Sequence, residues 1–188
     1  PPANTIFPVL LPDETDASGT VRHLAVGAGK DQNIYVVDRD NMGKFNSGSN
    51  TVYQELPSAL GGEEFAMPAY WNNTVYYGSV GDSIRAYPIV QAKLAPSPSS
   101  QTAHKFPYPG ATPSLSSNGA SNGVLWAVDN SSPAVLYAYD ATNLTHELYD
   151  SSQAANGRDQ FGAGNKYITP MIANGKVYVG TTNGVAVF

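Results

Sequence analysis

The chain has 188 residues, of which 41% are hydrophobic and only 13% are charged, and its formal net charge is −5 at pH 7. This balance indicates one globular domain with a sizeable core, and the lack of a basic run argues against nucleic-acid binding. There is no cysteine, which excludes disulfides and zinc–thiolate sites, and no stretch approaches the ~18 apolar residues of a membrane-spanning helix.

The first predicted unit covers residues 7–56 and consists of short apolar segments separated by turns. A strand headed by proline is expected at 7–10, because proline is tolerated at the first position of a strand. Two stronger strands are expected at 24–27 and 34–37, joined by a turn rich in Gly, Asp and Asn. An outer strand of alternating polar and apolar residues is expected at 51–56.

The later units repeat this order of strands, and the pattern predicts no helix in any of them. The second unit, residues 67–107, has its expected strands at 67–70, 75–78, 84–87 and 102–106. The third unit, residues 112–150, has them at 112–115, 124–127, 136–139 and 145–149. The fourth unit, residues 168–188, has only three, at 169–172, 177–180 and 185–188.

Two registers of strands share one period. The second strands begin at 24, 75, 124 and 177, in steps of 51, 49 and 53 residues. The third strands begin at 34, 84, 136 and 185, in steps of 50, 52 and 49 residues. Four antiparallel strands in a repeat of ~40–50 residues are typical of a β-propeller blade. The sequence therefore predicts an all-β propeller of about four four-stranded blades; a β-sandwich without true repeats is the alternative.

The last blade is expected to be incomplete, because the hairpin 175–188 has no outer strand after it. Residues 1–6 contain Pro1 and Pro2 and are weak donors of that strand. We therefore expect the C-terminal part of a larger propeller, closed by a second polypeptide that is either another chain or a second copy. A compact four-bladed propeller is the alternative.

Residues 29–43 and 169–181 resemble segments of bacterial β-propeller proteins with pyrroloquinoline-quinone-like repeats, and the likeness extends from residue 22 onward. The resemblance implies a scaffold more than a quinone enzyme. The quinoprotein dehydrogenases carry a repeated tryptophan-docking motif, whereas Trp71 and Trp126 follow no such turn. Their calcium ligands and catalytic Asp also have no counterpart that can be placed in this sequence. No cofactor is therefore expected; the quinone and calcium belong to the enzyme alternative.

Four aromatic residues are the candidate ligand-binding residues, namely Tyr70, Trp71, Tyr108 and Trp126. On loops or at a propeller axis, such rings suit the stacking of a carbohydrate or another small ligand. The other interpretation is packing between strands, which is the expected role of most of the twelve tyrosines.

Three groups of polar residues have simpler interpretations. The segment 38–43 places oxygen ligands at alternating positions, as in a calcium loop, but it lacks a closing carboxylate and is expected to be a turn. Glu63 and Glu64 are expected to be solvated. His104 and His146 fall on outer strands and are expected to be exposed.

The leading functional hypothesis is a non-catalytic, exported scaffold that binds another polypeptide or an extracellular polymer, without catalytic or metal-binding residues. Its location would be extracellular or periplasmic, since a surface low in charge is more common in secreted proteins. The alternative is a quinone- or metal-dependent oxidoreductase, or a polysaccharide-active propeller, whose active site is completed by a missing half.

Overall fold

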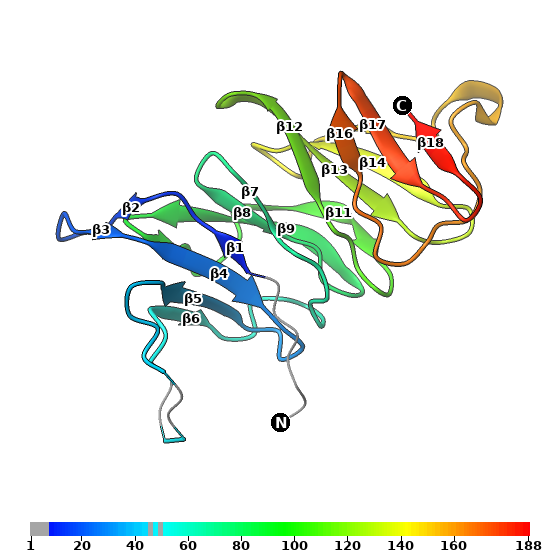
Figure 1. Cartoon of the computed structure of the whole chain (residues 1–188). Helices are drawn as coiled ribbons and strands as arrows, with labels where there is room; N and C mark the ends of the chain where they lie inside the picture. Colours follow the sequence, from blue (N-terminus) through cyan, green and yellow to red (C-terminus); the bar gives the residue numbers. More distant parts are fainter. Residues whose placement is uncertain (1–7, 45–46, 49–50) are drawn as a thin grey trace.

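The protein is an all-β molecule made of separate antiparallel sheets (Figure 1). The computed structural model describes residues 8–44, 47–48 and 51–188. The start of the first predicted strand, Phe7, and the segment with Pro1 and Pro2 lie outside the described residues. In the described part, no helix has the length and hydropathy needed to cross a membrane. The only helical segment there is a short 3-10 turn at Ala155–Gly157.

The first sheet has the strand order β1-β4-β5-β6. Its strands are β1 (Val9–Leu10), β4 (Leu24–Ala28), β5 (Ile34–Asp38) and β6 (Gln54–Leu56). A short hairpin that the sequence pattern did not predict, β2 (Glu14–Thr15) and β3 (Val21–Arg22), lies between β1 and β4 along the chain. The long connection that separates the first strand from the second is therefore itself partly ordered.

The second sheet is the largest, with five strands. They are β7 (Ala69–Trp71), β8 (Thr74–Tyr77), β9 (Asp82–Val90), β10 (Lys93–Leu94) and β11 (Ser100–Phe106). β9 pairs with β8 along one edge and with β10 and β11 along the other. Residues 89–94 thus supply the end of β9, a two-residue turn and the short β10.

The third and fourth sheets follow in chain order. The third sheet contains β12 (Ser114–Asn118), β13 (Ser121–Asp129), β14 (Val135–Asp140) and β15 (Glu147–Asp150). The fourth sheet contains β16 (Met171–Ala173), β17 (Lys176–Gly180) and β18 (Val185–Val187). The predicted hairpin between the last two strands is confirmed, because the Thr181 N–H donates to the Gly184 carbonyl across the turn at 2.9 Å.

Three separate apolar cores join neighbouring sheets. In β8, Val75 and Tyr77 belong to the core shared with the first sheet, whereas Tyr76 belongs to the core shared with the third. In β13, Leu125 faces the second sheet and Val128 faces the fourth. Side chains of successive strand residues alternate between faces, so the two middle sheets can bury both of their faces.

Two sequence expectations about polar residues are wrong. Glu64 is 1% exposed, because the loop before β7 folds against β8 and its neighbour: Glu64 N–H donates to the Gly29 carbonyl, and Glu63 carbonyl accepts the Val80 N–H. His104 is half-buried between the second and third sheets, because its ring stacks on Tyr137 with 4.5 Å between centroids and its Nε2 lies 2.8 Å from Asp129 Oδ2. The prediction of an exposed His146 is confirmed, since its side chain is 62% exposed.

Candidate functional site

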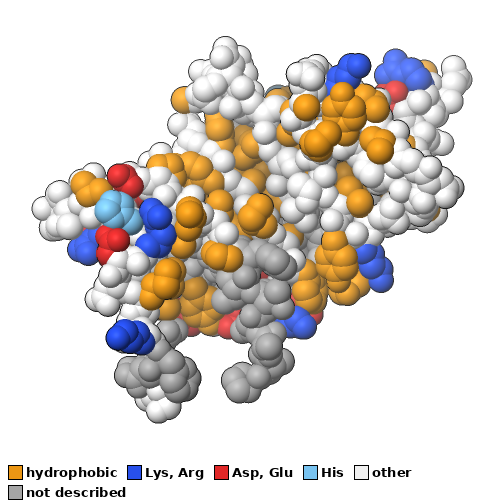
Figure 2. Space-filling model, viewed as in Figure 1, with side chains coloured by type: hydrophobic (Ala, Val, Ile, Leu, Met, Phe, Trp, Pro, Cys, Tyr) orange, Lys and Arg blue, Asp and Glu red, His pale blue; other side chains and the backbone are white. Residues whose placement is uncertain are grey.

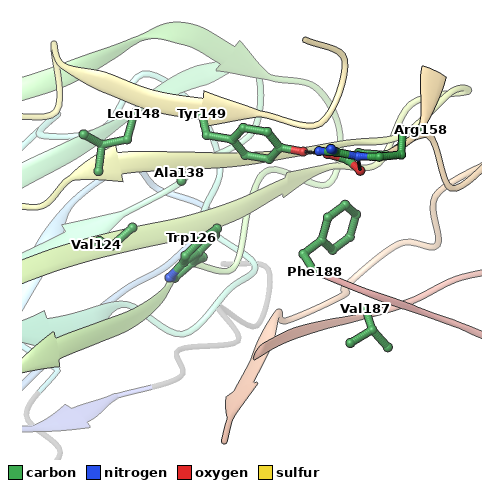
Figure 3. A pocket seen from close by; sticks show the side chains of 9 residues that line it. Val124, Trp126, Ala138, Leu148, Tyr149, Arg158, Val187 and Phe188 are labelled. Atoms are coloured by element: carbon green, nitrogen blue, oxygen red, sulfur yellow. Dashed lines mark hydrogen bonds and ion pairs between the residues drawn. The ribbon is translucent and has the colours of Figure 1, made fainter. Parts of the chain in front are cut away.

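A groove lies between the third sheet and the outer edge of the fourth (Figure 3). Its volume is about 470 Å³. Its lining comes from β13, β14, β15, β18 and the connection that follows β15. The lining residues are Val124, Trp126, Ala138, Leu148, Tyr149, Arg158, Asp159, Val187 and Phe188.

The floor of the groove is a row of side chains across three paired strands. Trp126 on β13 lies opposite Ala138 on β14, which in turn lies opposite Tyr149 on β15. Residues opposite one another in adjacent strands share a face of the sheet. The small side chain of Ala138 therefore leaves a hollow between two aromatic residues. The indole N–H of Trp126 donates to Ser116 Oγ at 2.9 Å, so its one polar group is satisfied.

The wall of the groove is β18. Phe188 and Val177 exchange both backbone hydrogen bonds at 2.9 Å. Antiparallel pairs alternate between bonded and non-bonded, so the N–H and C=O groups of Val185 and Val187 point away from β17. These two valines are 62% and 51% exposed. The Phe188 ring points toward the third sheet and packs edge-on against Phe161, with 5.5 Å between ring centroids.

One end of the groove carries an ion pair. Arg158 donates from two nitrogens to both carboxylate oxygens of Asp159, each at 2.7 Å, and the Tyr149 hydroxyl donates to the same carboxylate. These bonds lower the pKa of Asp159 to about 2. Burial, together with the bond to Asp159, raises the pKa of Tyr149 to about 12. Asp159 therefore stays ionised and Tyr149 stays neutral at physiological pH, which holds the tyrosine ring in place at the rim.

The other three sheets have a strand where the fourth sheet has this groove. Their outer strands β6, β11 and β15 pair with β5, β9 and β14 respectively. Among the described strands, β18 pairs with β17 alone. The groove is thus bounded by an open backbone edge on one side and by the outer strand of the neighbouring sheet below.

The four aromatic residues singled out from the sequence do not form one site. Trp126 lines the groove. Trp71 packs between the second and third sheets, where its indole N–H donates to the Gly119 carbonyl at 2.8 Å. Tyr70 packs against the core between the first and second sheets. Tyr108 lies in a different aromatic cluster, on the loop that leads to β12.

Of the nine groove residues, only Trp126 was singled out from the sequence, and those that were missed include Leu148, Tyr149, Arg158 and Phe188. Three of them stood on expected strands, but the pattern could not show which faces meet. The last strand gave a weak signal for Phe188, because the strand is apolar to its end and does not alternate apolar with polar residues there. No pattern pointed to Arg158, which follows the 3-10 turn in the long connection after β15.

The candidate calcium loop at 38–43 is a turn whose carboxylates have protein partners. Asp38 Oδ1 accepts the Asp40 N–H at 3.0 Å, which confirms the turn interpretation of this segment. Asp40 Oδ2 lies 2.6 Å from His23 Nδ1, so that carboxylate also has a protein partner. Within the described ranges, no three His, Asp or Glu side chains gather in a way that could hold a metal ion. Trp71 and Trp126 lie in different inter-sheet layers and form no repeated docking motif.

Comparison with known proteins supports the fold alone. No protein-family profile matches the chain. No curated protein matches it either. Among solved structures, the computationally designed Ika4 protein superposes with a TM-score of 0.56 at 14% identity, over 88% of this chain and 84% of that one. The computationally designed Ika8 protein gives a TM-score of 0.39 at 16% identity, over 88% of this chain and 55% of that one.

Proposed function

We propose that the chain is a non-catalytic, exported β-propeller scaffold of the PQQ-like repeat type that binds an extended strand of a second polypeptide beside β18. Four sheets in chain order, packed face to face through three cores, support consecutive blades. The twin periods of about fifty residues in the sequence support the same arrangement. The charged share of only 13% supports an extracellular or periplasmic location.

The observation that carries the proposal is the open edge of β18 above an apolar floor. An incoming strand would pair with the N–H and C=O groups of Val185 and Val187, which face that edge. Its inward side chains would cover Trp126, Leu148 and Tyr149, while its outward side chains would meet solvent. Main-chain hydrogen bonds would provide affinity and alternate side-chain pockets would provide specificity, as in other cases of strand addition.

The occupant is an extended segment and not β18 of a second copy. In antiparallel pairing of β18 with itself, the two-fold axis is perpendicular to the sheet, so the third sheets of both copies would lie on the same side of the joined sheet. β15 already occupies the layer beneath the open edge, so the two copies would overlap there. An extended segment that has no second sheet attached on that side would not overlap with β15. The outer strand β11, in which Thr102 and Phe106 are buried, shows the chemistry such a segment needs.

The test uses a labelled synthetic peptide with the sequence of residues 99–107, which includes β11, and the variant Val187→Pro. Proline removes the outward N–H of Val187 but is tolerated on a strand edge, where no ladder bond to β17 is lost. We expect saturable peptide binding to the wild-type protein, slower amide exchange at Val185 and Val187, and at least tenfold weaker binding to Val187→Pro.

The matched control is Val187→Ala, which shortens the side chain and keeps the N–H group. It is expected to bind the peptide within a few fold of wild type. Equal binding by the proline variant would show that the edge is not used, and the absence of saturable binding at millimolar peptide would refute strand addition at this groove.

A further inference from the structure

Three aromatic rings from three loops form a row on another part of the surface. Phe65 precedes β7, Tyr108 precedes β12 and Tyr167 precedes β16, so each stands on the loop that enters the first strand of a sheet. The centroids of Phe65 and Tyr108 are 5.8 Å apart, and the hydroxyl oxygens of Tyr108 and Tyr167 are 2.9 Å apart. The row borders a cavity of about 480 Å³ whose lining includes Phe65, Met67 and Tyr167.

This row is open to solvent although it is apolar. Tyr108 is 50% exposed, Tyr167 is 56% exposed and the neighbouring Met67 is 51% exposed. Tyr167 also has a φ of 63°, a left-handed backbone conformation that is unfavourable for a residue with a bulky side chain. The fold thus holds a large aromatic side chain toward solvent at some expense to stability, which is typical of residues retained for binding.

Two lysines stand over the same rings. Lys30 Nζ is 5.2 Å from the centroid of Phe65, and Lys166 Nζ is 4.8 Å from that of Tyr108. Within the described part of the chain neither lysine forms an ion pair with an acidic side chain. In a protein with a net charge of −5 and only ten basic residues, two unpaired ammonium groups beside one aromatic row make a local anion-binding surface.

We infer that this aromatic–lysine row, formed by Lys30, Phe65, Tyr108, Lys166 and Tyr167, binds an acidic oligosaccharide whose sugar rings carry carboxylate groups. The apolar face of a sugar ring stacks on an aromatic ring, and a carboxylate pairs with an ammonium group. Phe65 and Tyr108 meet edge to face with an angle of 76° between their planes, so successive sugar rings would contact ring faces of different orientation. A single small aromatic acid fits less well, because small-ligand sites bury ~70–90% of their ligand and these rings are half-exposed.

The experiment is calorimetric titration of the whole chain with hexagalacturonate, a chain of six uronic acids, and with neutral maltohexaose. We expect saturable binding of hexagalacturonate and binding of maltohexaose that is at least tenfold weaker. Binding should weaken as salt rises, because exposed charge pairs are screened.

Variants assign the binding to the row. Tyr108→Ala and the double variant Lys30→Gln/Lys166→Gln should each weaken hexagalacturonate binding at least tenfold. Lys93→Gln is the matched control, since Lys93 Nζ also stands over an aromatic ring, 3.5 Å from the centroid of Tyr53, but outside the aromatic–lysine row. It should leave binding unchanged.

Three results would overturn the inference. They are equal affinity for maltohexaose, equal affinity for polyglutamate of the same charge, and no saturable binding at millimolar sugar. Equal affinity for maltohexaose would show that the carboxylates are not recognised. Equal affinity for polyglutamate would show a general polyanion surface. The absence of saturable binding would show that there is no site. Because the row is separate from the β18 groove, these results do not bear on peptide binding there.

Discussion

At the scale of single residues, Glu64 has the environment that departs furthest from its expected one. Its carboxylate Oε1 accepts the Ala66 N–H at 2.8 Å, while Oε2 is buried without a hydrogen-bond partner among the described residues. Burial is the main cause that raises its pKa from 4.5 to about 7. The folded protein therefore holds a proton on Glu64 at pH values where the unfolded chain has released it.

This shift predicts a loss of stability toward alkaline pH. Below pH 4.5 the carboxyl is protonated in both states, and above about pH 7 folding must bury a charge. The free energy of unfolding should therefore fall between these values, by about 3 kcal/mol at most, since each pKa unit corresponds to about 1.4 kcal/mol. Glu64→Gln keeps the acceptor for Ala66 and carries no charge, so this part of the pH dependence should disappear.

Urea unfolding of both proteins at pH 5 and pH 8 measures the effect. The Gln variant can lose some stability at both pH values, because its amide N–H groups are buried, but the difference between the two pH values is the diagnostic quantity. If that difference is the same in the variant and the wild type, another group is responsible for it.

At the scale of elements, the sequence predicted the strands well and their surroundings poorly. The strand expected at 177–180 is β17 with one residue more, and the strand expected at 34–37 is β5 with one more. Alternation and turn residues act over a few positions, so such strands can be read locally. The hairpin β2–β3 was missed because Glu14–Thr15 and Val21–Arg22 are too short for a pattern.

Two glycines at equivalent strand ends should differ in their response to substitution. A Cβ on Gly78, after β8, would lie 2.5 Å from the Ala111 carbonyl oxygen. This oxygen belongs to the backbone, so the clash can be relieved only if the backbone moves. A Cβ on Gly180, at the end of β17, would meet only Ile168 Cδ1 at 3.2 Å, and that side chain can move. Gly78→Ala should therefore destabilise the fold by ~2–4 kcal/mol and Gly180→Ala by less than ~1 kcal/mol.

Thermal and urea unfolding of the two variants provide the comparison. Each serves as the control of the other, because both substitutions add one methyl group at the same position of the repeat. Equal effects would show that the close contact between Gly78 and Ala111 does not govern stability.

At the scale of the whole molecule, the sequence did not predict which strands and loops come into contact with one another. Trp126 was singled out because it is aromatic, whereas Tyr149 and Phe188 became groove residues only through the stacking of the fourth sheet on the third. Lys166 and Tyr167 lie in a connection without periodicity, and no pattern in the sequence pointed to Phe65. Sites built from several loops or from two sheet edges depend on contacts between residues distant in the chain.

The open arrangement of the sheets has a consequence for association. The fourth sheet packs on the third through one face, and its other face carries Met171, Tyr178 and Val187 opposite one another on β16, β17 and β18. Met171 is 57% exposed and Val187 is 51% exposed. In the space-filling view, hydrophobic side chains gather over this sheet with few charges among them (Figure 2). An exposed apolar face of this kind favours contact with another molecule.

We therefore expect the purified chain of 19.9 kDa to associate as its concentration rises, and Met171→Glu to suppress this association at least tenfold. A charge placed in the middle of the apolar face would have to be desolvated on contact, which is unfavourable. Met42→Glu is the matched control, since Met42 is 61% exposed on the segment after β5, away from the fourth sheet.

Light scattering over a concentration series measures the mass. The contrary result is a wild-type chain that stays monomeric at millimolar concentration and shows slow amide exchange at Val185 and Val187. It would mean that the molecule itself covers the edge of β18 and the apolar face of the fourth sheet. The compact four-bladed alternative would then replace the open scaffold.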